Sequence, residues 1–163
     1  MDTSQRIVFA SGCFDLFHVG HLYFLEHAST LGDRLIVGVQ TDDWIERTKG
    51  QKPIFPLHHR LRIISALKCV DVAFPVDGPK DEAGAVLMDV SIRAVGPDHG
   101  WLPDHQSLRE KMEAAGIQYV TVPETKVPDI STTIIKEKCF EEIRDTRPNY
   151  RDLNADYYGL RNP

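Results

Sequence analysis

The sequence predicts an α/β fold in which a five-stranded parallel sheet is doubly wound, with helices on both of its faces. Short apolar runs rich in β-branched residues alternate along the chain with longer segments that have helical periodicity. The first two of these runs are continuously apolar, which is typical of parallel strands that are covered on both sides. Parallel strands joined through helices require right-handed crossovers, and that connection produces a doubly wound sheet.

The first half of the chain is predicted to contain two strands and two helices. Arg6–Ala10 and Leu35–Val39 are the apolar runs of the two strands. The helix between them is marked by apolar residues at helical spacing: Leu22, Leu25, Ala28 and Leu31. The segment from Glu46 to Pro56 is polar and basic and contains glycine and proline, so we expect a mobile loop there. A second helix is predicted from about Leu57 to Lys68.

The second half of the chain repeats this alternation. Further strands are predicted over residues 70–76, 92–95 and 117–122, and further helices over residues 82–88, 106–115 and 132–143. In a doubly wound sheet, ligands bind beyond the carboxyl ends of the strands, where the strand order reverses. We therefore expect the chemistry in the loops that follow the first, fourth and fifth strands.

Composition excludes several classes of protein. A chain of 163 residues fits one domain, which we predict over residues 1–143, followed by a polar extension over residues 144–163 that lies on the surface or contacts another subunit. The net charge of −5 argues against a broad nucleic-acid surface. No apolar run approaches the ~20 residues that span a bilayer, and no signal peptide is recognised, so a cytoplasmic protein without membrane contact is expected. Three scattered cysteines suggest neither disulfides nor a zinc site.

The loop after the first strand carries two histidines around a glycine: it reads Gly-Cys-Phe-Asp-Leu-Phe-His-Val-Gly-His over residues 12–21. Because it precedes a helix, free backbone N–H groups and the helix dipole favour a phosphate there. His18 and His21 can donate hydrogen bonds to phosphate oxygens as charge builds up in a displacement reaction. On spacing alone, two ordinary surface histidines explain the pattern about equally well.

A second polar cluster, Ile-Ser-Thr-Thr over residues 130–133, stands before the last predicted helix. Taken alone, its hydroxyl groups would be read as simple helix caps. Paired with the histidine loop, which is predicted at the opposite end of the parallel sheet, the cluster instead indicates a second phosphate-binding segment.

These two segments together resemble the signatures of the cytidylyltransferase-like nucleotidyltransferases. Residues 12–21 are similar to the HxGH signature of that family, and residues 130–133 are similar to its second signature, in the form used by bacterial glycerol-3-phosphate cytidylyltransferase. The resemblance covers roughly residues 6–140. It implies a Rossmann-like nucleotidyltransferase fold and the transfer of CMP from CTP to a small phosphate- or phosphonate-bearing acceptor, with release of pyrophosphate.

The resemblance also implies roles for individual residues. The catalytic residues would be His18, His21, Lys49 and Lys126. The nucleotide would contact Ser11, Gly12, Cys13, Phe14, Asp15, Gly20, Asp98, Ile130, Ser131 and Thr132. The acceptor would contact Lys52, Arg60 and Lys80. Mg²⁺ would arrive with the triphosphate, no separate protein metal site is expected, and the enzyme would be a homodimer.

Several positions depart from the glycerol-phosphate pattern. Gln51 and His99 replace residues expected near the acceptor, and two additional residues precede Lys126. The acceptor therefore stays open between glycerol 3-phosphate, phosphonates and other phosphorylated alcohols or sugars. Two alternatives to a cytidylyltransferase also stay open: an adenylyltransferase of the same fold, and a nucleotide-binding regulatory module without catalysis.

Overall fold

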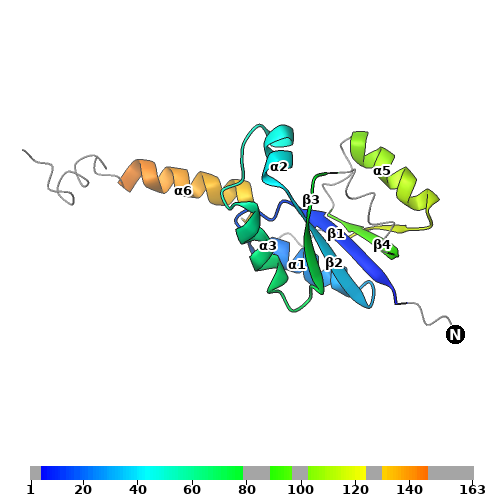
Figure 1. Cartoon of the computed structure of the whole chain (residues 1–163). Helices are drawn as coiled ribbons and strands as arrows, with labels where there is room; N and C mark the ends of the chain where they lie inside the picture. Colours follow the sequence, from blue (N-terminus) through cyan, green and yellow to red (C-terminus); the bar gives the residue numbers. More distant parts are fainter. Residues whose placement is uncertain (1–4, 79–88, 97–102, 124–129, 147–163) are drawn as a thin grey trace, which may run out of the picture. The chain divides into compact units, whose positions relative to one another are not determined.

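The computed structural model describes residues 5–78, 89–96, 103–123 and 130–146 (Figure 1). They belong to two compact units, one ending at Ile130 and the other beginning at Ser131, and each is described by itself. Within these ranges, no helix combines the length and the apolar character that a membrane crossing requires.

The first unit is built on one five-stranded sheet in which all paired strands are parallel. Its strands are β1 (Ile7–Gly12), β2 (Arg34–Gln40), β3 (Val72–Val76), β4 (Val90–Val95) and β5 (Gln118–Thr121). They lie in the order β3-β2-β1-β4-β5, so the chain builds outward from β1 in one direction and then, from β4, in the other. The predicted doubly wound parallel sheet is confirmed, and its switch point lies between β1 and β4.

Helices cover both faces of this sheet, as Figure 1 shows. Helices α1 (Val19–Ser29) and α3 (Leu57–Ser65) pack on one face, where Leu25 and Ile64 join the buried strand residues Val8 and Val37. Helix α5 (Pro103–Ala114) covers the other face through a second cluster that contains Phe9, Ile36, Leu108 and Met112. The two clusters follow the alternation of side chains along β1, since Val8 and Phe9 point to opposite faces.

The structure corrects the predicted loop from Glu46 to Pro56. Its first four residues belong to a helix, α2 (Asp42–Lys49), which buries only Ile45. Thr41 caps this helix by accepting a hydrogen bond from the Trp44 N–H, and Gly50 ends it in the left-handed conformation with φ of 70°. The helix is polar because it lies at the surface, and its charges suit the dipole, with acidic residues in the first turn and basic residues in the last.

The second unit contains helix α6 (Thr132–Thr146). It begins where the sequence predicts and continues through residues 144–146, which were predicted to belong to the extension. The helix predicted over residues 82–88 and the rest of the extension lie outside the described residues.

Both edge strands of the sheet are short. Strand β3 has five residues, and one of them is Pro75, while β5 has four. Proline has no N–H to give to a ladder, so sheets accept it mainly in edge strands and at bulges.

Candidate active site

The loop between β1 and α1, residues 13–18, which we call the histidine loop, begins at the carboxyl end of β1 and therefore at the switch point of the sheet. His18 is the N-cap of α1: its Nδ1 accepts a hydrogen bond of 3.2 Å from the Gly20 N–H. A ring nitrogen that accepts carries no proton, so the neutral His18 ring is protonated at Nε2. This cap leaves Nε2–H as the donor that His18 offers to a ligand.

His21 follows one turn later and stacks on His18, with ring centroids 3.8 Å apart and an angle of 24° between the planes. The edge of Phe14 and the tilted ring of Phe17 surround His21 at centroid distances of 5.5 and 5.6 Å. Its buried Nδ1 has no hydrogen-bond partner within the part of the chain that the structure describes. The pair therefore forms a compact, partly apolar unit at the start of α1.

This environment keeps both histidines neutral at pH 7. Burial lowers the pKa of His18. The pKa of His21 falls to about 4, first because the ring is buried and then because the charges of His18 and Lys49 oppose its protonation, while Asp15 acts in the other direction. A bound triphosphate would supply the negative charge that favours protonation, so the pair is suited to a polyanionic ligand.

Asp15 stabilises a strained part of the histidine loop. Its neighbours Phe14 and Leu16 have φ of 52° and 45°, in the left-handed region that side chains other than glycine rarely adopt. The Asp15 carboxylate is buried, and it accepts hydrogen bonds from the N–H groups of Leu16, Ile54 and Phe55 at 3.1, 3.0 and 2.9 Å. The backbone at residues 54 and 55 is thus held against the loop.

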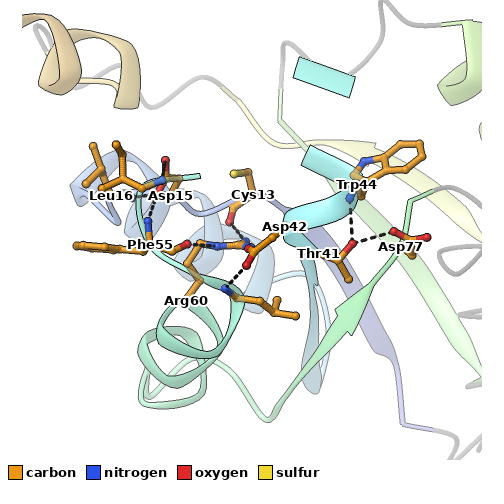
Figure 2. A network of polar contacts seen from close by, with 11 residues as sticks. Cys13, Asp15, Leu16, Thr41, Asp42, Trp44, Phe55, Arg60 and Asp77 are labelled. Carbon is orange, nitrogen blue, oxygen red and sulfur yellow. Dashed lines mark hydrogen bonds and ion pairs between the residues drawn. The ribbon is translucent and has the colours of Figure 1, made fainter. Parts of the chain in front are cut away.

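Arg60 connects the same loop to two other segments, as Figure 2 shows. Its Nε donates to the carbonyl of Phe55 at 2.8 Å, and its two terminal nitrogens donate to the carbonyl of Cys13 and to a carboxylate oxygen of Asp42, both at 2.6 Å. The residue is fully buried. The sequence predicts an acceptor contact for Arg60, but the structure directs its guanidinium to protein oxygens, because the residue is fully buried and three of its five N–H groups donate to those partners.

Two glycines at the predicted nucleotide contacts have an aromatic or imidazole ring close to where a Cβ would stand. A Cβ on Gly12 would lie 3.0 Å from the Phe14 ring, and one on Gly20 would lie 3.1 Å from the His18 ring. The hydroxyl of Ser11, at the end of β1, accepts a hydrogen bond of 2.7 Å from the buried Arg93. Neither Arg93 nor Asp42 was assigned a site role from the sequence. Arg93 is the lone charged residue of β4, and that was its only signal.

The two loop lysines have different surroundings. Lys49 ends α2, and its charge is the smallest of the causes that lower the pKa of His21. Lys52 is exposed and forms an ion pair of 3.6 Å with Glu46. Of the predicted site residues, the structure thus brings together the histidine loop, His21, Lys49 and Arg60.

The remaining predicted residues lie outside the described ranges or at the boundary between the two units. Lys80, Asp98 and Lys126 lie outside the described residues. Ile130 ends the first unit, and Ser131 and Thr132 begin the second. Within that second unit, Ser131 accepts a hydrogen bond of 3.2 Å from the Ile134 N–H, so its hydroxyl has the capping geometry that was the alternative explanation for this segment.

The described ranges contain no group of three or more histidine, cysteine or acidic residues that could hold a metal ion. The Asp15 carboxylate at the histidine loop already accepts three backbone N–H groups.

The model of one protein family, described as cytidylyltransferase-like, matches residues 9–138, a range that includes the histidine loop, α2 and Arg60. The chain belongs to the cytidylyltransferase-like family. The family prediction made from the two signature segments is therefore confirmed.

Among curated proteins, this cytidylyltransferase-like chain is similar to bifunctional proteins named HldE. It is 49% identical to the protein of Methylococcus capsulatus over 92 residues, which cover 55% of this chain and 20% of that protein. It is 37% identical to the protein of Alcanivorax borkumensis over 144 residues, 86% of this chain and 28% of that protein. The chain thus spans only about a fifth to a quarter of these relatives. They support the family, and they do not support the narrower resemblance to glycerol-3-phosphate cytidylyltransferase.

Among solved structures, the chain resembles the lipopolysaccharide core biosynthesis protein of Thermoplasma volcanium, with 30% identity and a TM-score of 0.65, covering 76% of this chain and all of that one. It also shares its fold with Thermotoga maritima TmcAL bound with alpha-thio ATP, at 18% identity and a TM-score of 0.54, over 91% of this chain and 56% of that one.

Proposed function

We propose that this chain is a nucleotidyltransferase that transfers a nucleoside monophosphate to a phosphorylated small molecule and releases pyrophosphate. The observation that carries the proposal is the stacked pair of His18 and His21 at the start of α1, beside the carboxyl end of β1. Helix dipole, free backbone N–H groups and two imidazole donors would all act on a triphosphate there. Family membership supports the same reaction.

The reaction would proceed by in-line displacement at the α-phosphorus. An oxygen of the acceptor phosphate forms a bond to that phosphorus, while the bond from the phosphorus to the bridging oxygen breaks and pyrophosphate leaves with the electron pair. The attacking oxygen is already an anion, so no general base is required. Catalysis would come from positioning and from donors aimed at the charge that builds on the phosphate oxygens, His18 and His21 first among them.

Other residues would bind the substrates. Lys49 would neutralise charge on the triphosphate, and the backbone from Ser11 to Phe14 would lie along the nucleotide. Asp98, Lys126 and the segment Ile130–Thr132 would complete the nucleotide site, with Lys52 and Lys80 nearer the acceptor. Mg²⁺ would neutralise and orient the β- and γ-phosphates.

For the nucleotide, we propose ATP first and CTP second. The CTP expectation rests on the resemblance of residues 14–18 and 130–133 to the family signatures, whereas the bifunctional HldE relatives support the adenylyltransferase alternative better. The same histidines and lysine would serve ATP and CTP, because these nucleotides differ only in the base, which is distant from the reacting phosphorus.

For the acceptor, we propose a sugar phosphate. The similar Thermoplasma structure is titled as a lipopolysaccharide core biosynthesis protein, and such cores are built from sugars. Glycerol 3-phosphate and phosphonates are the second candidates, because any compact oxyanion could attack in the same way.

The test is a screen of pyrophosphate release with ATP, CTP, GTP and UTP against sugar 1-phosphates, glycerol 3-phosphate and 2-aminoethylphosphonate, with Mg²⁺ present. We expect release that needs both a nucleotide and an acceptor and that is fastest with ATP and a sugar phosphate. Faster turnover of CTP with every acceptor would restore the cytidylyltransferase assignment. Specific nucleotide binding without pyrophosphate release from any combination would favour the regulatory module.

A matched pair of variants tests the histidines in whichever combination is active. His21→Ala should lower kcat on the order of 100-fold or more, because it removes a donor to the developing charge. His27→Ala removes an exposed imidazole from the same helix and should leave kcat unchanged. Equal kcat in the two folded variants would remove His21 from the mechanism.

A further inference from the structure

A network of buried polar contacts joins three segments that are distant in sequence (Figure 2). Asp42 is the first residue of α2, Arg60 lies in the first turn of α3, and the histidine loop follows β1. One carboxylate oxygen of Asp42 accepts from Arg60 at 2.6 Å, and the other accepts from the Leu57 N–H at 3.2 Å. Asp42 thereby fixes both the guanidinium and the start of α3.

The histidine loop depends on contacts from outside itself. Two residues beside Asp15 have positive φ, a conformation that persists only when neighbouring groups hold it. Arg60 holds the loop directly through the Cys13 carbonyl, and indirectly through Phe55, whose carbonyl it bonds and whose N–H bonds Asp15. Phe55 is thus bound at both of its backbone groups: its carbonyl accepts from the Arg60 guanidinium, and its N–H donates to the Asp15 carboxylate.

Both ends of α2 act on the same histidines. Its first residue, Asp42, reaches the loop through Arg60, and its last, Lys49, lies close enough to His21 to oppose the protonation of that ring. The distance between loop and helix therefore decides how strongly Lys49 and His21 can act on one ligand.

We infer that Arg60, held by Asp42, is a positioning residue that keeps the histidine loop in register with helix α2. The inference rests on the proposed function, since it concerns the same histidines, and it replaces the predicted contact of Arg60 with the acceptor. A planar guanidinium is needed, because its donors reach the Phe55 carbonyl, the Cys13 carbonyl and Asp42 in a fixed fork. A lysine keeps the charge but presents one nitrogen in place of this fork.

The test uses Arg60→Lys and Asp42→Asn in the full chain, without substrate, so that its outcome does not depend on finding the reaction. Arg62→Lys and Asp43→Asn are the matched controls, since both residues are exposed neighbours on the same helices. The first readout is the NMR titration of His21. The second is hydrogen exchange of the Ile54 and Phe55 amides, with the Leu35 amide, which donates to Asp71 at 2.7 Å, as an internal reference.

In folded Asp42→Asn and Arg60→Lys, we expect the pKa of His21 to rise from about 4 toward its ordinary value of 6.5, because the loop opens to water and, as a smaller effect, moves away from Lys49. Exchange at Ile54 and Phe55 should become about 10-fold faster or more, while the Leu35 amide is unchanged. The two control variants should match the wild type in both readouts.

Two results would overturn the inference. In one, the folded variants lose stability but keep the wild-type titration of His21 and the wild-type exchange at Ile54 and Phe55, so that the pair serves the fold alone. In the other, neither variant folds, and the pair is a requirement for folding rather than a positioning device. Failure of the wild type to release pyrophosphate would remove the proposed function, but the two readouts would still answer the question of position.

Discussion

Lowering the pH from 7 to 5 should destabilise this protein by about 2 kcal/mol through His21 alone. In the folded chain the pKa of His21 is about 4, whereas an unfolded histidine titrates at 6.5. Between these pKa values, His21 is protonated in the unfolded state but neutral in the folded state. The free energy of unfolding therefore decreases as the pH falls. Each pH unit inside this window is worth about 1.4 kcal/mol, and about 1.5 units of it lie between pH 7 and 5.

The assay is urea unfolding of the full chain at pH 7 and pH 5, with the free energy of unfolding taken by linear extrapolation. Other groups also titrate, so the quantity to compare is the difference between the two pH values in the wild type, in His21→Gln and in His27→Gln. The His21→Gln variant should show a difference smaller by about 2 kcal/mol. The His27→Gln variant, which loses an exposed imidazole of the same helix, should behave as the wild type does.

If His21→Gln keeps the full pH dependence of the wild type, His21 is not held neutral by burial. The argument that a bound triphosphate brings a proton to this ring would then fail with it.

Further predictions concern the loops and the assembly. Asp15→Asn should lower the free energy of unfolding by about 2 kcal/mol or more, because an amide nitrogen would face a backbone N–H that the carboxylate now binds. Gly78→Ala should lower it by about 2–4 kcal/mol, since its Cβ would lie 2.6 Å from an indole ring at φ of 84°, whereas Gly50→Ala, with open space at φ of 70°, should lose only about 1 kcal/mol; equal losses in urea unfolding would contradict this. Tryptic cleavage at Lys52 should slow when ATP or CTP is added with Mg²⁺, and an unchanged rate at saturating nucleotide would argue against closure over the ligand. Light scattering should show a homodimer, and a monomer at micromolar concentration would refute that expectation.

The strands could be predicted from the sequence because their signal is local. The runs of the first two strands are continuously apolar over a few residues, and that pattern is typical of buried parallel strands. The order of the strands could not be predicted in this way, because it depends on pairings between distant residues. Phe9, for example, pairs with Ile36 and with Arg93, and no local pattern encodes these pairings.

Helix α2 was missed although both of its ends carry signals. Thr41 before two aspartates, and Gly50 after a basic last turn, have the usual pattern of a capped helix. The prediction gave more weight to the polar, basic composition of the segment. Because the helix buries only one residue, its sequence has almost no apolar periodicity that would indicate a helix.

The site residues also differ in whether the sequence could predict their roles. The two histidines could be found because they lie in one short motif at the end of a strand, and α1 brings them together. The role of Arg60 could not, because its partners stand 5, 18 and 47 residues away along the chain. A basic residue near an anionic ligand site is expected to bind the ligand. Only the fold shows that the N–H groups of Arg60 donate to protein oxygens instead.

The short edge strands restrict how two copies of this protein can meet. A continuous sheet shared by two subunits requires long, regular strands at the outer rim, with free N–H and C=O groups in register. One rim here has Pro75 within a strand of five residues, and the other offers only four. We therefore expect any symmetric pair to be joined through helix surfaces, so that variants at the outer rims would leave self-association intact while variants on exposed helix faces would weaken it.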